Sequence, residues 1–163
     1  MPEYNKEFSE DLPYFSTAVQ PLRSLGEVQA IMEDFGVEQV MVQTGQSKGT
    51  HAWLIRFVYS GQVYRFVFTP KKCRNPEKVM TYAGKRRTNS EQSVYQMGRT
   101  AVYFTKAMLM AADVDPDALF AFAELPNNKT VAELGFDGVI QIVKDMPLQL
   151  SATNVIEGEI VEE

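Results

Sequence analysis

The sequence lacks the features that distinguish disulfide-bonded, membrane and secreted proteins from ordinary folded domains. Cys73 is its only cysteine, so no internal disulfide can form, which fits a reducing compartment such as the cytoplasm. It contains no run of about 18 apolar residues, and this predicts that nothing spans a membrane. The first residues are acidic and include no apolar segment, so they do not resemble a secretory signal. We therefore expect a cytoplasmic location and no membrane partner.

Residues that carry catalysis or bind metals are equally scarce. His51 is the only histidine, and Cys73 is the only thiol with which it could form a nucleophilic pair. One residue of each type is too few for a zinc site built from such ligands. Three aspartates alternate over residues 113–117 like the start of a calcium loop, but Ala118 stands at the sixth position, where such a loop needs glycine.

The glycine-rich motifs that bind nucleotides and the GxSxG motif of hydrolases are also missing. We therefore predict that the chain is not an enzyme and needs no cofactor or metal. A nuclease that uses carboxylates and a metal ion is the enzymatic alternative.

What the sequence does contain is enough apolar material for one domain. Of its 163 residues 45% are hydrophobic, and ten are Phe, so a core can form without disulfides or metals. We expect an N-terminal arm over residues 1–20, one domain over residues 21–147, and an acidic flexible tail over residues 148–163.

The order of periodic segments predicts an α+β fold: a three-stranded antiparallel sheet with an N-terminal helix, one long helix packed on a sheet face, and short C-terminal helices. Ser24 and Glu27, and again Thr88 and Glu91, have the spacing of a capping box. The expected elements are a helix over about 25–35, strands over 40–44 and on both sides of residues 60–61, a long connection over 70–89, a helix over about 90–112, and short helices to about residue 144.

The clearest local signal is a β-hairpin around Ser60 and Gly61. A two-residue turn there places Arg56 opposite Arg65 and gathers the aromatic side chains on one face. We predict that this face is core, because a large aromatic patch is rarely left in water. The alternative is a stacking platform for nucleic-acid bases. The face comprises Trp53, Ile55, Phe57, Tyr59, Tyr64, Phe66 and Phe68.

Charge is distributed unevenly along the chain. Residues 71–87 hold seven cations against one acid, a net charge of +6, so the remainder carries −11 of a total of −5. Acids gather near both ends, over residues 3–11 and 157–163. Such asymmetry can mark a basic contact surface, although a solvated loop with ordinary lysines gives the same pattern.

Arg56 and Arg65 require compensation, because like charges directly opposite on a sheet destabilise it. The favoured interpretation is an internal acid contributed by a helix, and the alternative is an external anion such as phosphate. In the second case the arginines would join the basic segment in a nucleic-acid site, with Tyr82 stacking on a base. The predicted site residues are Arg56, Arg65, Lys71, Lys72, Arg74, Tyr82, Lys85, Arg86 and Arg87.

Several segments resemble a group of uncharacterised proteins from phages, prophages and other mobile elements. The similar segments, in matching order over about residues 20–150, are YRFVF at 64–68 before Pro70, RTA at 99–101, KAML at 106–109, FAFAEL at 120–125, PNNKTV at 126–131 and MPL at 146–148. This chain differs at Gly98, where the group has a tryptophan beside an arginine, and at residues 127–128, where Asp-Gly is usual. The resemblance implies a fold and a phage-like context, hence a host-cell cytoplasm, and it assigns no functional residues.

These observations favour an accessory protein of phage-like DNA metabolism that binds nucleic acid, preferably single-stranded, without reading its sequence. The alternative is a protein-interaction module, such as a phage inhibitor of a host or defence protein. The first hypothesis requires the basic loop to converge with Arg56 and Arg65 on one face. The second requires an exposed apolar patch or an acidic stripe.

Overall fold

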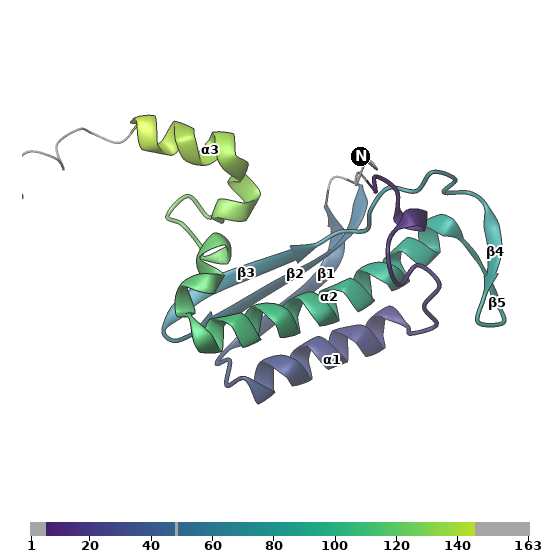
Figure 1. The fold of residues 1–163 in the computed structure, drawn as a ribbon, viewed down its shortest axis with the longest axis horizontal. Helices are drawn as coiled ribbons and strands as arrows, with labels where there is room; N and C mark the ends of the chain where they lie inside the picture. The colour runs from purple at the N-terminus through teal and green to yellow at the C-terminus, as the bar shows by residue number, and fades with distance from the viewer. Residues whose placement is uncertain (1–5, 48, 146–163) are drawn as a thin grey trace, which may run out of the picture.

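The computed structural model describes residues 6–47 and 49–145, so the predicted acidic tail over 148–163 lies outside the described residues. The predicted α+β class is confirmed (Figure 1). A short 3-10 helix, η1, covers Ser9–Asp11, and a second, η2, covers Pro116–Phe122. The other elements are α1 (Pro21–Asp34), β1 (Val40–Ser47), β2 (Thr50–Tyr59), β3 (Gln62–Phe68), β4 (Val79–Tyr82), β5 (Lys85–Thr88), α2 (Asn89–Val114) and α3 (Val131–Asp145).

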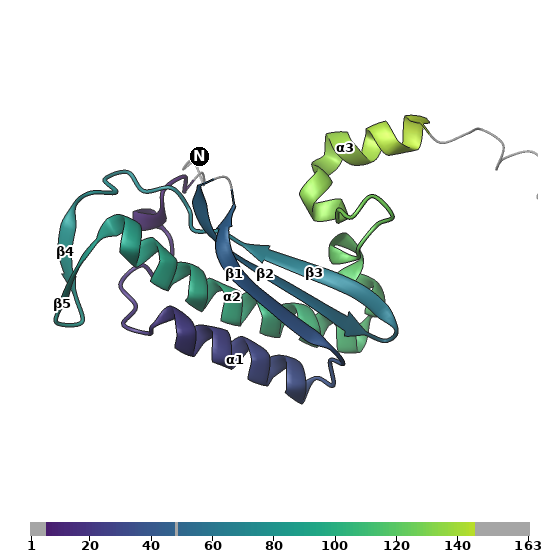
Figure 2. The ribbon, with the colours of Figure 1, turned by 180° about the vertical axis from the view of Figure 1, so that it is seen from behind.

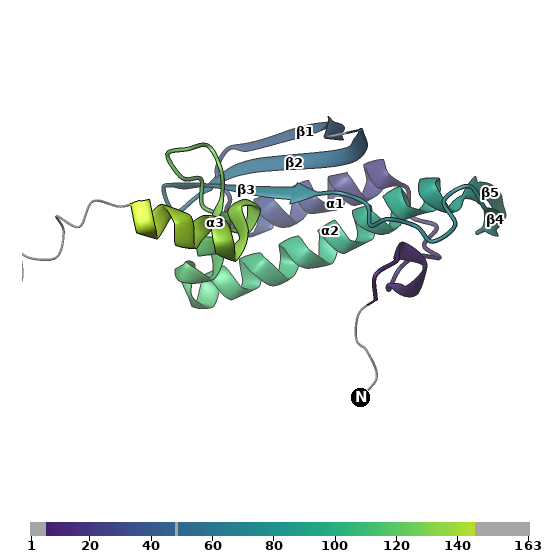
Figure 3. The same ribbon diagram turned by 90° about the horizontal axis from the view of Figure 1, so that it is seen from above.

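The molecule has two layers. Strands β1, β2 and β3 form an antiparallel sheet in chain order, and α1 and α2 lie side by side on one face of it (Figures 2 and 3). Seen from above, the sheet and the helix pair form separate layers, and neither helix crosses to the opposite sheet face. No helix within residues 6–47 and 49–145 is long and apolar enough to cross a membrane.

The β2–β3 hairpin has the predicted register. Arg56 lies opposite Arg65, and Phe57 opposite Tyr64. Ser60 and Gly61 have φ values of 49° and 78°, as a type I′ turn requires at both central positions. The turn thereby fixes which side chains share a face.

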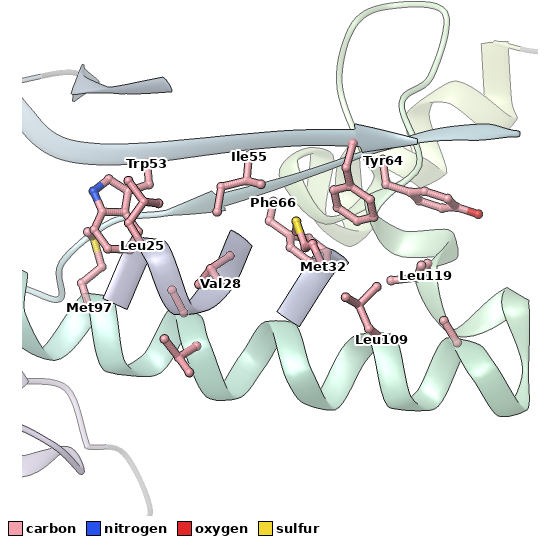
Figure 4. Close-up of a cluster of buried hydrophobic side chains, with 14 residues drawn as sticks. Leu25, Val28, Met32, Trp53, Ile55, Tyr64, Phe66, Met97, Leu109 and Leu119 are labelled. Carbon is pink, nitrogen blue, oxygen red and sulfur yellow. The ribbon is translucent and has the colours of Figure 1, made fainter. Parts of the chain in front are cut away.

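The aromatic face of this hairpin is core, as predicted, and it does not serve as a platform for bases. Trp53, Ile55, Phe57 and Phe66 are each at most 2% exposed. Figure 4 shows Trp53, Ile55 and Phe66 pointing from the sheet toward the helices, where Val28 and Met32 of α1 and Leu109 of α2 belong to the same cluster. Ring contacts between β2, β3, α2 and η2 give the cluster edge-to-face geometry, which aromatic pairs favour.

Of the two helix starts predicted from capping boxes, one needs correction. Helix α1 begins at Pro21 with Gln20 as N-cap, because proline tolerates the first helical position, where no N–H partner is needed. Ser24 therefore lies inside the helix and is buried, so the predicted capping box at Ser24 was wrong. The box at Thr88 and Glu91 is confirmed, with both reciprocal hydrogen bonds present.

The long connection predicted over residues 70–89 contains secondary structure that the sequence did not predict. It contains a second hairpin, β4–β5, whose turn residues Ala83 and Gly84 have φ values of 50° and 78°. The sequence of this hairpin lacks the alternation of apolar and polar residues that marks a strand, because cations interrupt it.

The packing of α1 and the sheet against α2 is tight at Gly98. A Cβ atom added there would lie 3.0 Å from the Ser24 Cβ and 3.3 Å from the Trp53 ring. Arg99 reinforces the crossing, since its guanidinium donates to the Glu27 carboxylate at 2.9 Å and to the Ser24 hydroxyl at 3.3 Å. The absent side chain of Gly98 thus lets α1, α2 and the sheet meet.

Gly98→Leu should destabilise the fold by about 1–3 kcal/mol through overpacking. The same substitution at Gly26 is the control, because a Cβ there meets nothing within 4 Å and leucine favours a helix over glycine by up to about 1 kcal/mol. Urea denaturation of the two variants measures the difference. Equal stability of both would contradict the close packing described for Gly98.

Candidate nucleic-acid interface

Arg56 and Arg65 lie on the outer sheet face, and each is paired with a carboxylate of the same chain. Arg56 binds the Glu124 carboxylate through two hydrogen bonds of 2.6 and 2.9 Å. Arg65 binds both carboxylate oxygens of Glu133, at 2.9 and 2.6 Å, and the backbone carbonyl of Asn128 at 2.6 Å. Of the two alternatives for this opposed pair, the geometry agrees with the internal acid.

The pKa of Glu124 lies below its usual value, because the hydrogen bonds from Arg56 favour the carboxylate. Glu124 is anchored by the backbone, since residue 123 bridges to Tyr64 and the Glu124 N–H donates to the Val63 carbonyl. The segment after η2 thus extends along the edge of β3 and delivers a carboxylate to the arginine pair. On this part of the outer sheet face, the positive charges of the two arginines are therefore neutralised by carboxylates of the same chain.

Part of the basic segment is also paired, here with acids of the N-terminal arm. Lys72 binds the Glu7 carboxylate and Arg74 binds Asp11. The Glu10 carboxylate accepts the backbone N–H groups of Arg74 and Asn75, both at 3.0 Å. Burial alone would raise the pKa of Glu10, but these hydrogen bonds lower it. The part of the arm that the structure describes therefore packs against the basic segment.

Tyr82 and Arg87 are held within the fold. The Tyr82 hydroxyl donates to the Asn89 side chain at 2.8 Å, and its ring meets Phe15 edge to face. Arg87 is 9% exposed, where its guanidinium stacks 3.9 Å from the centre of the Tyr95 ring and donates to Gln92 at 3.1 Å. Neither side chain is free to contact a phosphate or a base.

Three predicted site residues remain exposed without an acidic partner among the described residues: Lys71, Lys85 and Arg86. Lys78 shares this property and directly precedes β4. Lys85 and Arg86 follow the Ala83–Gly84 turn, so they occupy the tip of the second hairpin. We call Lys71, Lys78, Lys85 and Arg86 the open cations.

The predicted site residues fall into two groups that the structure does not bring together. The β4–β5 hairpin lies beyond the N-terminal end of α2, whereas η2 and α3, beside the paired arginines, lie at its C-terminal end (Figures 1 and 3). The convergence that the sequence hypothesis required is absent from the described residues. The hairpin and the arginine pair are separate features.

His51 and Cys73, the lone candidates for a nucleophilic pair, line one hollow of about 420 Å³ beside the first turn of α2. The His51 Nε2 atom is buried without a hydrogen-bond partner among the described residues. Burial raises the pKa of the Cys73 thiol, and the thiol lies 3.4 Å from the Asn89 carbonyl. A raised pKa is the reverse of what activates a cysteine. No group of three or more His, Cys, Asp or Glu side chains in the described part of the chain could hold a metal ion.

Alkylation of Cys73 by iodoacetamide should have a pH–rate profile displaced to higher pH than that of the urea-unfolded chain. The raised pKa leaves less thiolate at any given pH, and only the thiolate reacts. A midpoint below that of the unfolded chain would contradict this and would indicate an activated nucleophile.

The sequence did not predict which residues would pair with the predicted site residues. The opposed arginines predicted an acid, but nothing local identified Glu124 and Glu133, which lie 68 residues away from Arg56 and Arg65, respectively, along the chain. Gln92 and Gln96, which bind the arm, looked like ordinary polar helix positions. Their four-residue spacing placed them on one face, the signal that was available.

Comparisons with known proteins add no assignment. No protein-family model matches the chain, and no curated protein or solved structure matches it either.

Proposed function

We propose that this protein binds nucleic acid as an accessory factor, through electrostatic contact between phosphates and the basic end of the molecule. The proposal follows the sequence hypothesis of a preference for single strands and of a phage-like context. It relocates the contact surface to the β4–β5 hairpin and Lys71 and leaves Arg56 and Arg65 out of it.

The observation that carries the proposal is the position of the open cations. Lys85 and Arg86 lie on a short hairpin that stands away from the sheet (Figure 2), and Lys78 directly precedes it. Lys71 lies in the segment between β3 and this hairpin, and the overall charge of the chain is −5. An exposed hairpin with a basic tip can contact a phosphate backbone while the acidic remainder of the surface, which repels phosphates, stays farther away. Contacts to phosphate carry no sequence information, which accords with binding that does not depend on sequence.

Lys85→Ala combined with Arg86→Ala should weaken binding to a single-stranded oligonucleotide by about tenfold or more at low salt. The slope of log K against log salt should become shallower by about one to two, because two phosphate contacts are lost. Fluorescence anisotropy over a salt series measures both. Arg87 stays unchanged, since its stacking on Tyr95 is part of the fold.

The matched control is Lys106→Ala combined with Lys129→Ala, which removes the same charge from exposed positions outside the hairpin. Equal losses in both double variants would reduce the effect to net charge and refute a role for the hairpin. No binding by the wild type at any salt concentration would refute nucleic-acid binding itself.

The acids of the arm should limit affinity for nucleic acid. Glu7→Gln with Asp11→Asn frees Lys72 and Arg74 for phosphate, so affinity should rise and the salt slope should steepen by up to about two. Thermal stability should change little, because exposed ion pairs contribute about 0–1 kcal/mol each. Unchanged affinity in this variant, with its fold intact, would show that the two cations do not contact the strand.

Protein binding is the second candidate, and the exposed stripe of α2 favours it. Tyr103, Met110 and Val114 lie seven and four residues apart on one helix face, with exposures of 48%, 53% and 88%. Phe120 of η2 is 64% exposed. The Lys85→Ala/Arg86→Ala variant distinguishes this candidate from nucleic-acid binding, because it removes charge from the hairpin and leaves the apolar stripe of α2 unchanged.

A further inference from the structure

An apolar pocket of about 360 Å³ lies between the N-terminal arm, the end of β3 and α2. Its volume falls in the range of small-ligand sites, and its apolar walls with a few polar groups have the usual composition of such sites. Leu12, Pro13 and Tyr14 form the arm side, and Phe68 and Met97 contribute from the sheet and the helix. Thr69, Lys71, Gln96 and Thr100 complete the lining.

The arm side of this pocket is fixed by two buried glutamines of α2. The Gln96 amide donates to the backbone carbonyls of Ser9 at 3.0 Å, Leu12 at 3.2 Å and Pro13 at 2.8 Å. The Gln92 amide donates to the carbonyls of Phe15 at 2.7 Å and Thr17 at 2.8 Å. Both glutamines are at most 4% exposed, so water competes little for these bonds.

Tyr14 lies between these two attachments in a strained conformation. Its φ is 67°, in a region that residues with bulky side chains rarely adopt. Such strain costs about 1–3 kcal/mol and is found preferentially at ligand sites. The Tyr14 ring stacks on Tyr103 with centroids 4.9 Å apart, and it remains 46% exposed. The arm thus holds an accessible aromatic ring in place at the pocket.

Lys71 adds a positive charge to the same pocket. It is exposed and is one of the open cations, in contrast to Lys72, which Glu7 neutralises. Apolar walls, an aromatic ring and one cation are complementary to a planar ring that carries an anionic group. A nucleotide has this chemistry, since its base supplies the ring and its phosphate the charge.

We propose that the pocket accepts one unpaired base of a nucleic-acid strand, with a neighbouring phosphate on Lys71 and the strand continuing to the β4–β5 hairpin. This inference rests on the proposed function and gives it a reason to prefer single strands. A base in a duplex is stacked and paired, so it must leave the helix before it can enter a pocket. The stacking role that the sequence suggested for Tyr82 passes to Tyr14.

The test compares an oligothymidylate with an abasic oligomer of equal length, which has the same phosphates and no bases. In anisotropy titrations the wild type should bind the oligothymidylate about tenfold more tightly, the usual effect of one base–aromatic contact. Thr100→Phe fills the pocket and should abolish that preference while leaving affinity for the abasic oligomer unchanged. Thr100→Ala keeps the pocket open and is the matched control.

Tyr14→Gly is the second variant. Glycine adopts the φ of 67° without strain, so this variant should fold and should also lose the preference for bases. Lys71→Ala should weaken binding to both oligomers. Thymidine monophosphate tests the other source of the same chemistry: competition with the oligothymidylate, lost in Thr100→Phe, would show that a single nucleotide fills the site.

Equal affinity of the wild type for the two oligomers would overturn the base pocket and leave the phosphate contacts standing. A preference that survives both Thr100→Phe and Tyr14→Gly would likewise overturn it. Absence of binding to either oligomer at low salt would refute the proposed function and this inference with it.

Discussion

The aromatic face of β2 and β3 leaves water only if amphipathic helices lie along it, and the longer of the two that do so, beside α1, is α2. With 26 residues, α2 is about 39 Å long, whereas the ten residues of β2 extend over about 33 Å. The helix therefore continues past the sheet at its N-terminal end (Figure 1). The first two turns of α2 carry Gln92 and Gln96, and they provide the base to which the arm and the second hairpin attach.

Features governed by neighbours in the chain were predictable from the sequence. The Ser60–Gly61 turn fixed the register of the hairpin, and the register separated the buried aromatic residues from Arg56 and Arg65. The capping box at Thr88 placed the start of α2. Ser24 failed as a cap because Pro21 already satisfied the requirements of a helix start. Local spacing alone does not decide between two valid starting points.

The candidate site depended on contacts between distant parts of the chain, and here sequence reasoning identified the charges but not their fate. Seven cations between residues 71 and 87 look equivalent in a sequence, yet the fold pairs Lys72 and Arg74 with the arm, buries Arg87 and exposes Lys85. Pairing and burial follow from tertiary packing, which a charge pattern does not encode.

The arm is attached by two kinds of bond that respond differently to ions in solution. Amide-to-carbonyl hydrogen bonds from Gln92 and Gln96 involve no net charge and come from buried side chains, whereas the pairs Lys72–Glu7 and Arg74–Asp11 are exposed and screened by salt. Dissolved ions therefore weaken the charged contacts without detaching the arm. Under the proposed function, a cation that is already paired with a carboxylate releases fewer counterions from a nucleic-acid strand, so binding would depend less steeply on ionic strength than the number of lysines and arginines implies.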